Sequence, residues 1–263
     1  MSTMTADTDS SLYADTGEWK LIISISKKGL KAILLSLVEP GAEPETLVSR
    51  SWNHKNEEDI LRNIEDIIYD NPRILEDFAT RIIIETDKVA WVPLQHSEED
   101  DPAAEFFTTI YPASPEDIFV EYDGDKACIF TLVAGIKSFL ERTLPGCRIN
   151  CTANIVLNFI KKQLEERGQT ASKNDFIGAI AIGNTVYTYA FRNNEFIGGA
   201  PHPFTSATDI AYYIMLLCKA YDIQPASSRI LLSVAPEAAS EACEILCRYG
   251  AEPEIIPVLQ TLI

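Results

Sequence analysis

The sequence lacks the glycine-rich motifs with which most nucleotide-binding proteins hold phosphate groups. It contains no Gly-x-x-x-x-Gly-Lys-Ser/Thr motif, and no Gly-x-Gly-x-x-Gly follows an apolar run that could form a strand. A Gly-x-Ser-x-Gly motif, which places a nucleophilic serine on a sharp turn in many hydrolases, is also missing. These absences exclude the common phosphate-binding loops and leave a serine or cysteine nucleophile without support.

Basic residues and histidines are scarce. The chain has 22 Lys and Arg against 39 Asp and Glu, a formal net charge of -17, and only 3 His. Such a charge repels phosphate backbones, so we expect no binding of nucleic acid. The acidity favours solubility, and its alternative reading is a basic partner protein. His202 lies between two prolines in an expected loop, where it is either exposed or a catalytic base.

Long apolar runs are absent too. None approaches the roughly 20 residues of a membrane-spanning helix, so we expect no membrane insertion. The first 17 residues lack the basic start and apolar stretch of a signal peptide, which predicts a flexible tail and a cytoplasmic location. The 6 cysteines are expected as reduced thiols rather than a disulfide scaffold. Cys243 and Cys247 share an expected helix face, but two ligands are too few for structural zinc, so we predict buried cysteines and no metal site.

The sequence does contain one pattern of elements twice: three strands, a helix and an apolar strand. The first copy has expected strands at 19–26, 31–38 and 46–52, a helix at 57–69 and a strand at 81–84. The second has expected strands at 176–182, 186–192 and 195–200, a helix at 206–221 and a strand at 229–232. This order, used twice, is that of the ribonuclease H-like and actin-like folds.

A different block separates the two copies. It has an expected hairpin over 118–132 with an Asp-Gly turn, a helix at 136–144, a strand at 148–151 and a helix at 153–167. Residues 169–174 are polar and read as a linker. We therefore predict four parts: a tail (1–17), a first ribonuclease H-like lobe (18–112), an inserted α+β subdomain (113–152), and a linking helix with the second lobe (153–263).

This order of elements resembles the pilus-assembly and cell-division branch of the actin-like ATPase superfamily, in which a similar block lies between two such lobes. Residues 179–191 resemble the second phosphate-binding hairpin of that superfamily. The whole chain is similar to an uncharacterised bacterial family with an actin-like fold. The resemblance implies an α/β protein of the actin-like ATPase fold, with two ribonuclease H-like βββαβ units and an inserted α+β subdomain.

The chain departs from that superfamily where chemistry is concerned. The resemblance implies an acidic residue at the end of the first strand of each lobe, to orient magnesium and the attacking water. The corresponding positions are Ser24 or Ser26 in the first lobe and Ala181 in the second, and neither side chain type holds magnesium. The same lack argues against a two-metal nuclease. The pair Gly198-Gly199 is interpreted as a strand end or bulge rather than a nucleotide contact.

These observations predict a degenerate ATPase, that is, a non-catalytic cytoplasmic scaffold or protein-interaction protein without a cofactor. The alternative is a sensor that binds a nucleotide, such as ATP, or a sugar phosphate in the interlobe cleft without hydrolysis. A small-molecule kinase with relocated acids is a third reading. The sensor's candidate ligand-binding residues form two hairpin turns expected to face each other: Ser26, Lys27, Lys28 and Gly29, with Gly183, Asn184 and Thr185. The second set is equally explained as a simple turn, and Gly29 is expected to take a positive φ.

Overall fold

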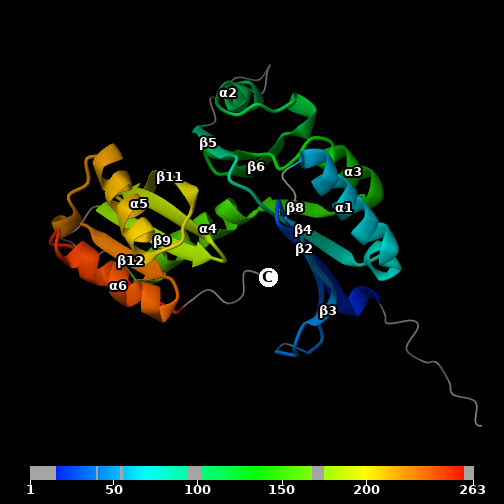
Figure 1. The fold of residues 1–263 in the computed structure, drawn as a ribbon, viewed down its shortest axis with the longest axis horizontal. Coiled ribbons are helices and arrows are strands. Elements are labelled where there is room, and N and C mark those ends of the chain that lie inside the picture. Colours follow the sequence, from blue (N-terminus) through cyan, green and yellow to red (C-terminus); the bar gives the residue numbers. More distant parts are fainter. Residues whose placement is uncertain (1–15, 40, 54–55, 94–101, 168–174, 258–263) are drawn as a thin grey trace, which may run out of the picture. The chain divides into compact units, whose positions relative to one another are not determined.

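The computed structural model describes residues 16–39, 41–53, 56–93, 102–167 and 175–257 (Figure 1). Within these ranges the chain forms two five-stranded sheets and one three-stranded sheet, with helices between the strands. It divides into two compact units, Met1–Ile84 with Val133–Ile149, and Glu85–Leu132 with Asn150–Ile263. None of the described helices has the length and apolarity needed to cross a membrane.

The first unit contains the first copy of the repeated pattern. Its sheet has the strand order β3-β2-β1-β4-β8, and β1 pairs antiparallel with β2 from Trp19 opposite Ser36 to Ser26 opposite Gly29. The elements are β1 (Trp19–Ser26), β2 (Gly29–Ser36), β3 (Glu45–Ser51), α1 (Glu57–Asp70), β4 (Ala79–Glu85), α3 (Ile136–Thr143) and β8 (Arg148–Cys151). The predicted order of strand, strand, strand, helix and strand is therefore confirmed here.

Helix α1 begins and ends where its sequence signals predict. The side chain of Asn56 accepts a hydrogen bond from the Glu58 amide at the first turn, and Pro72 follows the last helical turn. Three isoleucines spaced four residues apart, Ile60, Ile64 and Ile68, are buried on one side of the helix. The apolar spacing of the sequence thus becomes the packed face of α1.

Gly29 is required for a reason that differs from the predicted one. It is not among the glycines with a positive φ, so the expectation of a left-handed turn residue is wrong. A Cβ atom at this position would lie 2.6 Å from the carbonyl oxygen of Arg50 on β3. Glycine is needed because the neighbouring strand approaches closely, which depends on the pairing of β2 with β3 and not on the turn.

The second unit contains the second copy and the three-stranded sheet. Its five-stranded sheet has the order β11-β10-β9-β12-β13, with β12 parallel to β9, and the smaller sheet has the order β5-β7-β6. The first sheet and its helices are β9 (Asp175–Ile182), β10 (Thr185–Arg192), β11 (Glu195–Pro203), α5 (Ala207–Ala220), β12 (Arg229–Ser233), α6 (Pro236–Cys247) and β13 (Pro253–Ile255). The remaining elements are β5 (Val89–Pro93), α2 (Pro102–Ile110), β6 (Phe119–Asp123), β7 (Lys126–Phe130) and α4 (Thr152–Arg167). The second copy is confirmed as well.

The small sheet takes one strand from outside the range predicted for the inserted subdomain. Strand β5 belongs to the sequence assigned to the first lobe, but it pairs antiparallel with β7 from Val89 opposite Phe130 to Pro93 opposite Lys126. The four-part division remains a prediction. The expected tail up to residue 15 and the linker at 169–174 lie outside the described residues, whereas Thr16–Glu18 forms a 3-10 turn before β1.

The sheet of the second unit is covered on both faces. Alternate residues of β9, Ile177 and Ala179, pack in one core with α5 and α6. The intervening Gly178 faces α4, where an added Cβ would lie 2.6 Å from the Cδ1 atom of the buried Ile160. The lack of a side chain at Gly178 therefore allows the Ile160 side chain of α4 to approach the sheet.

Glu121 attaches the three-stranded sheet to α4. One of its carboxylate oxygens accepts the backbone N–H of Cys151, immediately before the helix begins. The other accepts side-chain N–H groups of Asn150 at 2.8 Å and Asn154 at 3.1 Å. Two residues further along β6, and so on the same face of the strand, Asp123 forms an ion pair of 2.5 Å with Lys161 of α4. Strand β6 is therefore held to α4 at two consecutive positions of one face.

We expect Glu121→Ala to lower the free energy of unfolding by about 2–4 kcal/mol, because each buried donor left without an acceptor costs about 1–3 kcal/mol. Chemical denaturation measures the change. The matched control is Glu116→Ala, an exposed acid ahead of the same strand, which should change stability by less than about 0.5 kcal/mol. Equal denaturation midpoints for the two variants would contradict this account of Glu121.

A second prediction concerns the contact between Gly178 and Ile160. Gly178→Ala should destabilise the chain by about 1–3 kcal/mol, because the added methyl group overpacks the α4 side chain. In the background Ile160→Ala the same change should be much milder, with a coupling energy above about 0.5 kcal/mol. A double-mutant cycle from denaturant unfolding tests this, and strictly additive effects would show that the two residues do not compete for space.

Candidate functional site

In the first predicted phosphate-binding turn, several polar groups form hydrogen bonds with one another. The hydroxyl of Ser26 accepts the Lys28 N–H at 3.1 Å and donates to the Gly29 carbonyl oxygen at 3.3 Å. The Lys27 ammonium group lies 3.9 Å from the Glu57 carboxylate. The backbone carbonyl oxygen of Lys27 accepts the Trp52 indole N–H at 2.8 Å. Lys28 is exposed. The structure thus brings these four residues together in the hairpin between β1 and β2 of the first unit.

The second predicted turn joins β9 and β10 in the other unit. Gly183 has a φ of 55°, as a tight turn requires, and the Asn184 carbonyl oxygen accepts the Phe204 N–H at 3.0 Å. The Thr185 hydroxyl donates to the carboxylate of Glu85 at 3.2 Å. A carboxylate group therefore lies beside the hairpin that was expected to meet a phosphate. That the two turns face each other across a cleft remains a prediction.

The two strand positions that resemble metal-orienting sites carry no acid. The Ser24 hydroxyl on β1 is buried and has no hydrogen-bond partner within the described residues. Ala181 lies near the end of β9 and is half-buried. Over the part of the chain that the structure describes, no three His, Cys, Asp or Glu side chains gather in a group able to hold a metal ion.

Carboxylates of the chain occupy the N-terminal ends of two helices in the second unit. Glu121 accepts hydrogen bonds at the start of α4, as described above. At the start of α5, Asp209 accepts the N–H groups of Thr205 at 2.8 Å and Ser206 at 3.0 Å, together with the Thr205 hydroxyl at 2.9 Å. Hydrogen bonds from Thr205 and then Ser206 lower the pKa of Asp209. Both helix ends, where a phosphate could otherwise bind, are thus neutralised from within.

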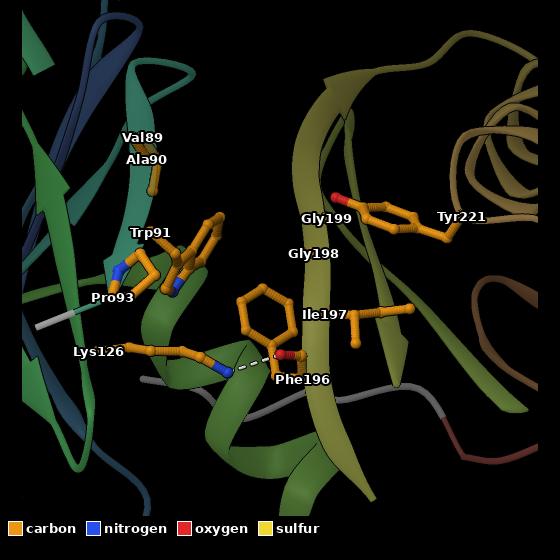
Figure 2. A pocket seen from close by; sticks show the side chains of 10 residues that line it. All are labelled: Val89, Ala90, Trp91, Pro93, Lys126, Phe196, Ile197, Gly198, Gly199 and Tyr221. Carbon is orange, nitrogen blue, oxygen red and sulfur yellow. Dashed lines mark hydrogen bonds between the residues drawn. The ribbon is translucent and has the colours of Figure 1, made fainter. Parts of the chain in front are cut away.

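A pocket in the second unit was not anticipated. It has a volume of about 270 Å³ and lies between β5 and β11, which are edge strands of the two sheets of this unit (Figure 2). The residues that shape it are Trp91, Lys126, Phe196, Gly198, Gly199 and Tyr221. The one signal in the sequence was the glycine pair, which was noticed but could not be connected with Trp91, more than a hundred positions earlier.

The glycine pair lies within β11, directly after the extra residue of a bulge, so the bulge adjoins the pair rather than consisting of it. Gly198 lies opposite Ala190 and Phe196 opposite Phe191, so Ile197 is the extra residue. A Cβ on Gly198 would lie 1.7 Å from the Tyr221 hydroxyl, and one on Gly199 would lie 2.1 Å from the Thr188 carbonyl oxygen. No larger residue fits, because the Tyr221 hydroxyl and the β10 strand already lie against the two glycines.

Aromatic rings and two polar groups complete the pocket. The ring of Trp91 meets those of Tyr189 and Phe196 edge-on, each with centroids 5.4 Å apart. The Lys126 ammonium reaches across from β7, donates to the Phe196 carbonyl oxygen at 2.6 Å and lies 5.4 Å from the centre of the Phe196 ring (Figure 2). The indole N–H of Trp91 is buried and has no acceptor in the described residues.

Two further expectations about single residues are wrong. His202 lies within β11 opposite Val186 rather than in a loop, and its ring stacks on Tyr213 at 4.2 Å and 6°. Burial lowers the pKa of His202, which favours the neutral ring. Cys243 is half-buried and Cys247 is exposed, because α6 buries the face of Ala239, Ala242 and Leu246 instead.

Comparison with solved structures finds several that are similar to this chain to different degrees. A Bacteroides thetaiotaomicron protein described as having an actin-like ATPase fold and unknown function is 14% identical over 93% of this chain and 94% of that chain, with a TM-score of 0.70. The PilM-PilN type IV pilus biogenesis complex is 11% identical over 90% of this chain and 88% of that chain, with a TM-score of 0.46. The cytoplasmic domain of EpsL from the Vibrio cholerae type II secretion system is 10% identical over 92% and 87%, with a TM-score of 0.41.

The likeness to the Bacteroides protein concerns the fold, and it confirms the expected actin-like ATPase architecture. A comparison with curated protein sequences finds no match. A family model described as a protein of unknown function, DUF3822, matches residues 9–252, and the chain therefore belongs to that family.

Proposed function

We propose that this chain is a non-catalytic scaffold that keeps the actin-like fold and binds a protein partner in the cytoplasm. The observation that carries the proposal is where carboxylates stand in this chain compared with where the fold would use them. Carboxylates are missing where the fold would orient magnesium, at Ser24 or Ser26 and at Ala181. One is present where the fold would receive phosphate, at Glu85 beside Thr185.

Phosphoryl transfer depends on a metal that bridges phosphate oxygens and on a positioned nucleophile. Serine and alanine side chains supply neither an anionic metal ligand nor a general base. A phosphate placed at the β9–β10 hairpin would also have to compete with the Glu85 carboxylate for the Thr185 hydroxyl group. Both effects oppose hydrolysis, and the second opposes tight binding of the nucleotide itself.

The partner is expected to be basic, because the chain has a formal net charge of -17. Complementary charge raises association rates and selects against acidic partners. Crosslinking in the native cell, followed by mass spectrometry, should identify one protein whose purified form binds this chain more weakly as salt concentration rises. A chain that forms no specific crosslinks, or a complex that is insensitive to salt, would contradict this part of the proposal.

We predict that millimolar ATP or ADP with magnesium leaves the thermal unfolding of the full chain unchanged, and that no phosphate is released. Binding to the native state at 100 times the dissociation constant would instead add about 2.7 kcal/mol, a shift of several degrees. Magnesium-dependent turnover that is lost on substitution of Gly183 would overturn the non-catalytic reading.

The thermal unfolding experiment also distinguishes the sensor alternative from the scaffold. A ligand-induced shift, with nucleotide or sugar phosphate, that is abolished by Lys28→Glu would favour the sensor over the scaffold. Lys31→Glu is the matched control, since Lys31 is also exposed and lies on β2 outside the turn. Equal shifts in the two variants would place any binding elsewhere than at this turn.

A further inference from the structure

We propose that the pocket between β5 and β11 binds a planar aromatic ring that carries a carboxylate group. The ring would lie among Trp91, Phe196 and Tyr221, and its carboxylate would pair with the ammonium group of Lys126 (Figure 2). This inference does not rest on the lack of catalysis, because the pocket is built by residues of the second unit that the phosphate hairpins do not use.

The volume of the pocket sets the size of the ligand. A cavity of about 150 Å³ holds benzene, and pockets for drug-sized molecules begin at about 300 Å³. The present pocket, at about 270 Å³, lies between these limits. It therefore suits one or two fused rings with a short substituent, and it is too small for a nucleotide.

The walls select a flat apolar group. Aromatic rings prefer edge-to-face or offset contacts, and the Trp91 and Phe196 rings, 5.4 Å apart, already meet edge-on. On the β11 side, Gly198 carries no side chain, which allows the Tyr221 ring to lie against the strand and line the pocket. The buried Trp91 N–H lacks an acceptor, and an unpaired buried donor is unfavourable. A hydrogen-bond acceptor on the ligand would remove this unfavourable state by binding the Trp91 N–H after a shift of the surrounding side chains.

The charge of the pocket selects an anion. Lys126 is half-buried, and its ammonium group uses one of three N–H donors on the Phe196 carbonyl oxygen. No carboxylate of the described residues pairs with it, although the chain is strongly acidic and the nearby Asp123 is paired with Lys161. A cation that is partly removed from water and faces a carbonyl group and a ring is stabilised by an anionic partner. The two remaining N–H donors of Lys126 favour a carboxylate as that partner.

Two sources offer this chemistry: a free aromatic carboxylate, and the C-terminal aromatic residue of another polypeptide. Isothermal titration of the full chain with indole carboxylate, and with a peptide that ends in tryptophan, separates them. Binding of the free acid alone assigns a small-molecule site, and tighter binding of the peptide assigns a polypeptide terminus. Either result supports the pocket, and binding of neither probe at millimolar concentration overturns it.

The role of Lys126 is tested with charge-matched variants. Lys126→Met should weaken binding of the probe by at least about tenfold, the loss expected for one charge-assisted hydrogen bond. Lys126→Arg should retain binding, and Lys162→Met, which removes the same charge from an exposed position on α4, should leave it unchanged. Indole carboxamide and the amidated peptide should bind Lys126→Met and the unaltered chain equally weakly. Unchanged affinity for indole carboxylate in Lys126→Met overturns the proposal.

Discussion

The carboxylate of Glu121 joins the three-stranded sheet of the second unit to α4. It collects one backbone and two side-chain donors at the start of α4, and Asp123 repeats the attachment on the same face of β6. Because β6 is paired with β7, and β7 with β5, this attachment also fixes the strand that carries Trp91. Helix α4 in turn packs on the opposite sheet, where the Tyr189 hydroxyl donates to the Ala153 carbonyl oxygen at 2.8 Å. The position of the pocket between β5 and β11 follows from these contacts.

Acidic residues of this chain accept hydrogen bonds at the ends of two helices and beside one hairpin. Glu121 and Asp209 satisfy helix ends, and Glu85 accepts the hydroxyl of Thr185. A carboxylate at a helix N-terminus is favourable because it meets unpaired N–H groups and the positive end of the helix dipole. Once such a group is part of the same chain, a free phosphate must displace it and also overcome its charge. Groups of the chain itself thus satisfy both helix ends.

Much of the fold could be predicted because its determinants are local. Helix α1 was bounded by an asparagine cap and an Asn-Pro stop, and its buried isoleucines follow the helical repeat. The turn at Asn193-Asn194 has left-handed backbone at both residues, a conformation that asparagine adopts readily. Predictions from local sequence were wrong where a distant segment of the chain determines the local structure. Gly29 is required by β3, and His202 lies in a strand because β11 continues along β10 beyond its predicted end.

The sequence by itself determined the repeated pattern of strands and helices and the lack of acids at Ser24 and Ala181. Both depend on residue type and spacing, which a single chain displays. Only the tertiary structure decided that Glu85 lies beside Thr185, and that Trp91, Lys126 and Tyr221 meet around Gly198. Glu85 and Thr185 are 100 positions apart, and Trp91 and Gly198 are 107 positions apart. Their proximity depends on strand pairing and on a bulge that shifts the register by one residue. No local pattern encodes such a register, because it results from the packing of whole sheets.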